Sequence, residues 1–194
     1  IASRTVKARD KACAQAIELL EKFVSSHSSH RRAAEANTQL GKLQMVRAAQ
    51  AMSGDVDTSA RDKARELYTA AAKTFDSSIQ DLRQKLEQMQ GARIDPARDP
   101  EKAQLRDQYR FQYLMAQLNA GEARLSGAET YSDPAAQGKE LLQSALEQFT
   151  ELSEKYGSRY PQGAMAYYSR GKIEQLLGKK DEAINSYLQM LDQP

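Results

Sequence analysis

The residues best suited to chemistry in this sequence are two histidines and a single cysteine. His27 and His30 stand three residues apart, a spacing that two metal ligands can use, but no acidic or thiol ligand is adjacent. Two ligands without a third rarely hold a metal ion. Cys13 lies between two alanines and, as the only cysteine, cannot form a disulfide within the chain. We therefore expect no metal site, and we interpret Cys13 as a small helix residue.

Patterns typical of enzymes are also missing from the sequence. It contains no Ser/His/Asp arrangement, and its carboxylates are scattered among lysines and arginines at helix-surface spacing, which is typical of a solvated face. The Gly41-Lys42 and Gly171-Lys172 pairs lack the glycine-rich spacing of a phosphate-binding loop. We therefore expect neither catalysis nor a cofactor in this chain.

The charge balance bears on the kind of partner. The sequence holds 28 basic and 26 acidic residues, a net charge of +2, which argues against nucleic acid as the main partner. Residues 1–47 are more basic, with nine basic and four acidic residues and a net charge of +5. We interpret this stretch as a solvated face, with an acidic partner near the N-terminus as the alternative.

The composition predicts an all-α fold. Ala, Gln, Glu, Lys, Arg and Leu are plentiful and β-branched residues are few, which favours helices over strands. No segment approaches the ~20 apolar residues of a membrane span. The hydrophobic periodicity predicts no sheet and seven helices, near 3–25, 31–53, 58–90, 98–127, 133–157, 161–177 and 180–192.

The helix expected from residue 58 is unusually long. Beyond Phe75 it carries Ile79, Leu82, Leu86 and Met89 at spacings of 3, 4 and 3, a short heptad seam. Residues 91–98 should break it, and the Asp99-Pro100 pair should start the next helix, with Asp as cap and Pro in the first turn. We expect the two helices to return antiparallel as a hairpin over residues 76–113. Ile79, Leu82 and Leu86 should then face Leu105, Tyr109 or Tyr113.

Internal repetition runs through the sequence. Six of twelve positions are identical between Ala12–Phe23 and Ala145–Tyr156, and both segments end in an aromatic residue. A third copy is aligned at Ala64–Phe75 and a fourth at Ala183–Pro194. Near the C-terminus, the small residues Gly171 and Ala183 are followed by Tyr187 and Met190, so two antiparallel helices could approach closely there.

This small–small–aromatic–apolar spacing resembles a tetratricopeptide repeat. The resemblance implies antiparallel helix pairs stacked in a right-handed solenoid that forms a single domain over residues 1–194. Its expected parts are the second helix of a truncated repeat (3–30), a repeat (31–75), the hairpin extension (76–113), a second repeat (114–157) and a compact repeat (158–194).

In this family, first helices line a concave face that binds peptides. Carried over to this sequence, the face would present Thr38, Lys42 and Met45 on one helix and Tyr168, Lys172 and Gln175 on another. The resemblance implies a protein-binding scaffold whose partner carries acidic and apolar side chains; an architectural or oligomerisation module is the alternative. No lysine here is followed four residues later by asparagine, so binding of chaperone C-terminal tails is disfavoured.

Two features bear on origin and location. The chain begins at Ile1 without a methionine, so we expect it to be a piece of a longer bacterial chain from which a targeting signal could have been removed. The connector at 154–161, Glu-Lys-Tyr-Gly-Ser-Arg-Tyr-Pro, is similar to those of the longer repeats in bacterial envelope proteins. That similarity favours the periplasm or cell envelope over the cytoplasm.

Overall fold

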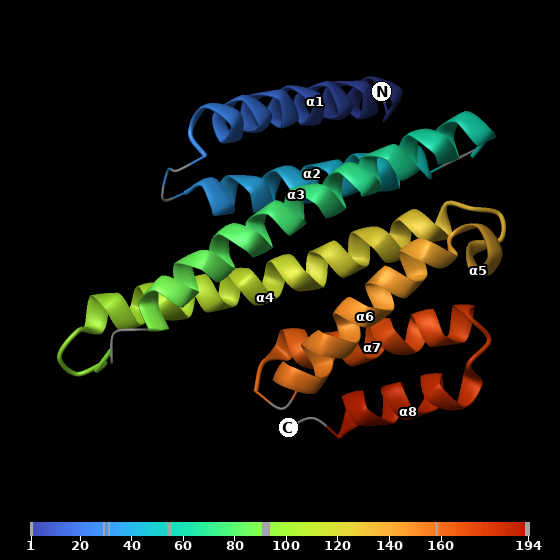
Figure 1. Ribbon diagram of the computed structural model, residues 1–194. Coiled ribbons are helices and arrows are strands. Elements are labelled where there is room, and N and C mark those ends of the chain that lie inside the picture. The colour runs from blue at the N-terminus through green and yellow to red at the C-terminus, as the bar shows by residue number, and fades with distance from the viewer. Residues whose placement is uncertain are drawn as a thin grey trace.

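The computed structural model of the protein describes residues 2–28, 30, 32–53, 56–90, 94–157 and 159–192. Over these residues all the regular structure is α-helical, which confirms the expected fold class (Figure 1). The helices are, in chain order, α1 (Ala2–Ser26), α2 (Ala33–Ala51), α3 (Thr58–Gln90), α4 (Pro100–Glu129), α5 (Pro134–Gln137), α6 (Lys139–Tyr156), α7 (Pro161–Leu176) and α8 (Lys180–Leu191).

The single helix expected over 133–157 was wrong, because Gly138 divides it into α5 and α6. Asp133 caps α5 as expected, its side chain accepting a hydrogen bond from the backbone N–H of Ala136 at 3.0 Å. At Gly138 the backbone leaves helical geometry, with φ −97° and ψ 9°. A Cβ at Gly138 would lie 2.9 Å from the Cβ of Ala128. The chain therefore bends where a missing side chain lets it pass close to α4.

The helices pack in chain order. Each of α1 to α4 contacts the next, and the series continues through α4 with α6, α6 with α7, and α7 with α8 (Figure 1). Helix α4 also contacts both α2 and α7. Such an arrangement buries apolar surface mainly between neighbours.

Three glycines mark the closest helix contacts, and each faces an aromatic ring. A Cβ at Gly41 would lie 2.6–2.9 Å from ring atoms of Phe75, and a Cβ at Gly121 would lie 2.5–3.0 Å from those of Phe149. At Gly171 the nearest atoms, at 2.5–2.9 Å, belong to Tyr187. Because these glycines lack side chains, an aromatic ring of α3 packs directly against α2. In the same way, a ring of α6 packs against α4, and a ring of α8 packs against α7.

These glycine–aromatic contacts align the repeated segments with one another differently from the sequence alignment. Ala145 and Ala183 each stand four residues before the ring that faces a glycine, and both are buried. The residue in that place before Phe75 is Ala71, which is fully buried. The alignment instead began the third copy at Ala64, seven residues earlier.

Helices α3 and α4 form the expected antiparallel hairpin. Ile79, Leu82 and Tyr113 lie in one buried cluster, and Leu86 and Tyr109 pack against it while partly exposed. Leu105, also expected in the seam, is instead 40% exposed. The break expected over 91–98 is confirmed where it is described, because α3 ends at Gln90 and residues 94–99 are not helical; residues 91–93 lie outside the described residues. Asp99 occupies the N-cap of α4 before Pro100, as expected, but its side chain makes no capping hydrogen bond.

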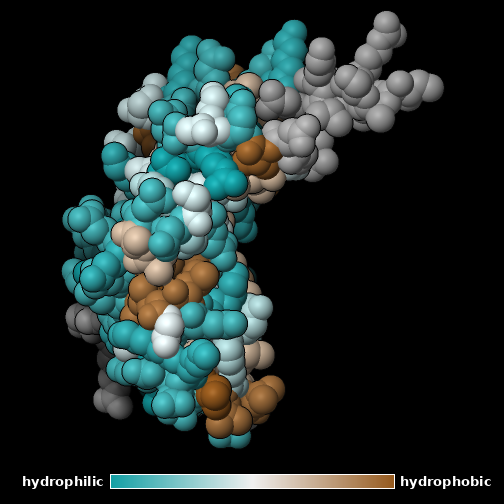
Figure 2. All heavy atoms as spheres, turned by 90° about the vertical axis from the view of Figure 1, so that its right-hand side faces the viewer, coloured by the Kyte–Doolittle hydropathy of each residue, from teal (hydrophilic) through white to brown (hydrophobic). Residues whose placement is uncertain are grey.

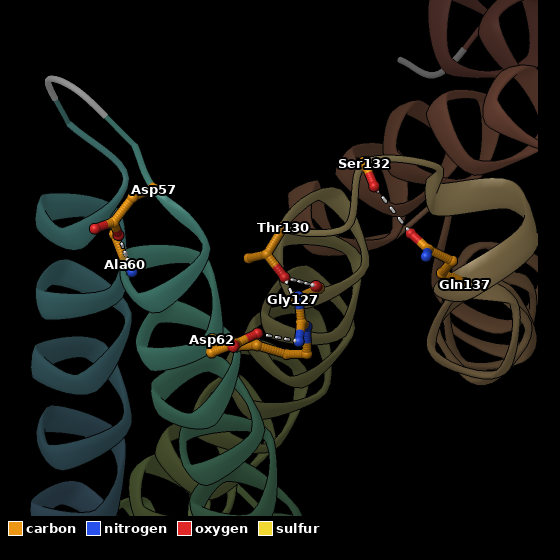
Figure 3. A network of polar contacts seen from close by, with 8 residues as sticks. Asp57, Ala60, Asp62, Gly127, Thr130, Ser132 and Gln137 are labelled. Atoms are coloured by element: carbon orange, nitrogen blue, oxygen red, sulfur yellow. Dashed lines mark hydrogen bonds and ion pairs between the residues drawn. The ribbon is translucent and has the colours of Figure 1, made fainter.

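A polar network fixes the start of α3 to the end of α4 (Figure 3). The Arg65 guanidinium donates from Nε to Thr130 Oγ1 at 3.0 Å and forms an ion pair with Asp62 at 2.8 Å. It also lies over the Tyr131 ring, 3.7 Å from the centroid. Thr130 is buried and donates its hydroxyl hydrogen to the carbonyl of Gly127 at 2.7 Å. One arginine thus holds the base of the hairpin together.

Replacing Gly121 by alanine should destabilise the protein, whereas the same change at Gly127 should not. The new methyl group at Gly121 would overlap the buried Phe149 ring, and overpacking costs roughly 1–3 kcal/mol. At Gly127 the nearest atoms are 3.4 and 3.5 Å away, so a gain of up to about 1 kcal/mol from helix propensity should prevail. Urea unfolding measures both free energies, and equal effects would contradict the close-contact argument.

Candidate functional site

The start of α7 is set by a tight connection to α6. Tyr160 is extended at the N-cap, with φ −139° and ψ 137°, and Pro161 occupies the first turn, where its missing N–H costs no helix hydrogen bond. A Cβ at Gly163 would overlap backbone atoms of Tyr156 and Gly157. Only glycine at this position lets α7 begin so close to the end of α6. The exposed side of α7's first two turns is thereby brought beside this connection.

A hollow of about 890 Å³ lies along this side of α7, and we call it the α7 hollow. Its exposed apolar side chains are Met165 and Tyr168 from α7, 55% and 51% exposed, and Met190 from α8. Glu122 of α4 also lines it and accepts a hydrogen bond from the hydroxyl of Ser169. The full lining is Glu122, Gly157, Arg159, Tyr160, Pro161, Ala164, Met165, Tyr168, Ser169 and Met190.

A buried carboxylate places α8 against α7. Glu174 is buried, and its Oε1 pairs with Arg170 Nε at 2.8 Å. The hydroxyl of Ser186, on α8, donates to Glu174 Oε2 at 2.6 Å. A buried charge needs such partners because removing it from water is costly. This network, together with Tyr187 seated on Gly171, fixes the position from which Met190 reaches the α7 hollow.

The three residues predicted on α7 surround Tyr187. The rings of Tyr168 and Tyr187 lie 6.0 Å apart, and Gln175 Oε1 accepts a hydrogen bond from the Tyr187 hydroxyl at 3.3 Å. Lys172 is ion-paired with Glu129 of α4 at 3.6 Å. Burial raises the pKa of Tyr187, the neighbouring Tyr168 adds to the rise, and Lys172 opposes it. Of the three, only Tyr168 lines the α7 hollow.

The three residues predicted on α2 have different surroundings. The hydroxyl of Thr38 donates to the carbonyl of Ala34 at 2.9 Å, within its own helix. Lys42 is exposed, whereas Met45 is partly buried against the hydrophobic core. Helix α4 packs against both α2 and α7, so the two sets of three residues lie on separate helices to either side of it.

Most of the α7 hollow was missed by reasoning from the sequence. Met165 stands three residues before Tyr168 and therefore on the same helical face, a signal that could have identified it. Met190 and Glu122 come from other helices, and no local pattern links them to α7. Over the described part of the chain, no group of three or more His, Cys, Asp or Glu gathers as a metal site.

Comparison with protein-family models, curated proteins and solved structures finds no match to this chain. Among the helices that the structure describes, none combines the length and apolar character needed to cross a bilayer. The geometry and chemistry of the surface therefore carry the information about function.

Replacing Ser186 by alanine should lower the free energy of unfolding by about 1–3 kcal/mol, because the buried Glu174 carboxylate would lose a donor. Ser77→Ala is the matched control, since Ser77 is exposed on a helix. Chemical denaturation of both variants measures the difference. A loss at Ser186 no larger than that at Ser77 would contradict the role of Ser186 in docking α8.

Proposed function

We propose that this chain is a non-enzymatic scaffold that binds a segment of another protein in the α7 hollow. The observation that carries the proposal is the gathering of Met165, Tyr168 and Met190, all exposed, around one 890 Å³ depression. Protein-binding sites are typically apolar at the centre, and Tyr and Met are enriched there. An apolar side chain of the partner would remove these three residues from water.

The proposal includes a tetratricopeptide-like organisation. The recurring glycine–aromatic contact supports it, because it pairs α2 with α3, α4 with α6 and α7 with α8 in the same way. In this interpretation α1 is the second helix of a first pair, and the outer parts of α3 and α4 extend one pair as a hairpin. Figure 2 shows a curved outline hollowed on one side, as stacked pairs would produce. Helices α2, α4 and α7 would then line the concave face.

The chemistry of the hollow favours a partner segment with an apolar anchor. Arg159 at the rim would meet an acidic side chain beside that anchor. Lys172 already pairs with Glu129, so it adds less positive charge than an unpaired lysine would. Exposed ion pairs contribute about 0–1 kcal/mol each and weaken in salt, so apolar burial would supply most of the affinity.

A second function, an architectural or oligomerisation module, is favoured by the outer face of α8. Ile184, Leu188 and Leu191 stand at spacings of four and three residues and are 56%, 52% and 73% exposed. Such spacing places them on one side of the helix. Figure 2 shows apolar side chains gathered at the lower end of the molecule, the level at which α8 lies in Figure 1. An apolar stripe of this kind is a candidate contact surface.

An envelope location remains a prediction from the sequence. The net charge of +2 continues to favour a protein partner over nucleic acid. The proposed role needs no catalytic residue, cofactor or metal.

Peptides selected from a display library on the parent protein should bind the α7 hollow. We expect Tyr168→Ala and Met165→Ala each to weaken the selected peptides by about tenfold, or ~1.4 kcal/mol, measured by fluorescence anisotropy. Phe111→Ala is the matched control, because Phe111 is 57% exposed on α4 and lies outside the hollow. Peptides equally insensitive to all three variants, or equally weakened by them, would contradict the proposed site.

If the α8 face joins two copies of the chain, sedimentation equilibrium should detect dimers that disappear in the Ile184→Lys, Leu188→Lys variant. The added charges would have to be desolvated in an apolar contact, which is costly. Leu19→Lys controls for added surface charge, because Leu19 is 69% exposed on α1. A parent that remains monomeric at every concentration tested would exclude self-association through α8.

A further inference from the structure

A second hollow, of about 820 Å³, lies at the outer part of the hairpin, and we call it the hairpin cavity. The end of α3, the first half of α4, and the end of α6 with its following turn all line it. Five of its lining residues are cations, namely Arg83, Arg106, Arg110, Lys155 and Arg159. Among the described residues, two carboxylates, Glu87 and Glu151, line it with them, so positive charge exceeds negative by three in that part of the lining.

The cations have few counter-charges of their own. Arg106 and Arg110 share one carboxylate, that of Asp107, at 3.0 and 3.5 Å. Arg83 donates to the hydroxyl of Tyr113 at 3.2 Å, a neutral acceptor, and its charge also interacts with those of Glu87 and Glu151. Lys155 lies 5.4 Å from the centroid of the Tyr156 ring. Cation–π contacts and neutral acceptors hold a cation in place but leave its charge uncompensated.

The cations do not all lie on one helix face. Two of them have an acid four residues away on their own helix, Arg83 with Glu87 and Lys155 with Glu151, and Arg110 pairs with Asp107 three residues away. Here the cations come from three segments that are distant in the sequence and converge on one concave wall. Neighbouring cations in a cleft reinforce one another's field and so attract anions. The cost of holding like charges together is recovered when an anion binds between them.

We propose that the hairpin cavity binds a small anion carrying two or more phosphate groups. Four of the five cations are arginines, whose planar guanidinium offers paired donors that match phosphate oxygens. A polyvalent anion can reach several of them at once, which a single phosphate cannot. The volume lies in the usual range of small-molecule sites, about 300–1,000 Å³. The cations surround a depression and form no stripe, which favours a compact anion over a nucleic-acid strand.

This site is distinct from the α7 hollow, although the two adjoin. Arg159 and Tyr160 line both. Tyr160 also accepts a long hydrogen bond from Arg110 at 3.5 Å. The α7 hollow presents mainly apolar side chains and the hairpin cavity mainly cations, so they suit different ligands. The anion proposal does not depend on peptide binding.

Isothermal titration calorimetry with sodium tripolyphosphate tests the proposal on the whole chain. We expect saturable binding to one site, and at least tenfold weaker binding of orthophosphate, because one phosphate reaches fewer cations. Citrate has a similar charge but carries carboxylates, so citrate binding as tightly as tripolyphosphate would overturn the assignment to phosphate. Absence of tripolyphosphate binding at low ionic strength would overturn the site altogether.

Paired substitutions locate the anion. Arg106→Gln with Arg110→Gln on α4, and separately Lys155→Gln with Arg159→Gln at the end of α6, should each weaken tripolyphosphate by about tenfold or more. Lys63→Gln with Lys73→Gln removes the same charge from exposed positions on α3 outside the cavity and should change affinity less than about twofold. Thermal melting confirms that each variant folds, and the two cavity pairs provide independent readings. Equal weakening by the control pair would overturn the proposal in favour of general charge attraction.

Discussion

The packing of an aromatic ring onto a glycine in the facing helix is the contact on which the rest of this structure depends. Phe75, Phe149 and Tyr187 each occupy space that any side chain at Gly41, Gly121 or Gly171 would fill. Two helices can therefore approach until the ring touches the opposite backbone. Because protein interiors are close-packed, the ring also fixes how far each helix slides along its partner. The three contacts give three helix pairs a common geometry.

Helix length decides what lies outside those pairs. Helix α3 has 33 residues and α2 only 19, so at about 1.5 Å per residue α3 extends well beyond its partner. Its outer half packs instead against α4, which has 30 residues. Arg65 secures the other end of this hairpin by reaching Thr130 and Tyr131. The hairpin thus projects past the neighbouring helices and forms a wall that a shorter pair would lack.

The two hollows arise from these two features. The α7 hollow forms where the last pair meets α4, and its position depends on Tyr187 and on the buried Glu174. The hairpin cavity forms between the projecting wall and the end of α6. They meet at the connection between α6 and α7, which Gly163 holds tight. One short connection therefore borders an apolar surface on one side and a cationic surface on the other.

The sequence by itself determined the features that depend on neighbouring residues. Helix-forming composition indicated an all-α fold, and the Asp99-Pro100 pair marked a helix start, because caps and proline act locally. The pairing of α7 with α8 was also readable, because a short turn separates the two helices. The sequence paired Gly171 with Ala183, however, whereas the structure packs the Tyr187 ring on Gly171.

Only the tertiary structure decided features that join distant segments. The break at Gly138 depends on contact with Ala128 of α4. The packing of Phe75 on Gly41 shows that Ala71, and not Ala64, corresponds to Ala145 and Ala183 in the other helix pairs. Met190 lines the α7 hollow, and cations of α3, α4 and α6 share the hairpin cavity, because helix packing brings these distant segments together. Periodicity specifies which face of a helix is apolar but not where two helices cross. The crossing is set by packing, and it determines which side chains meet.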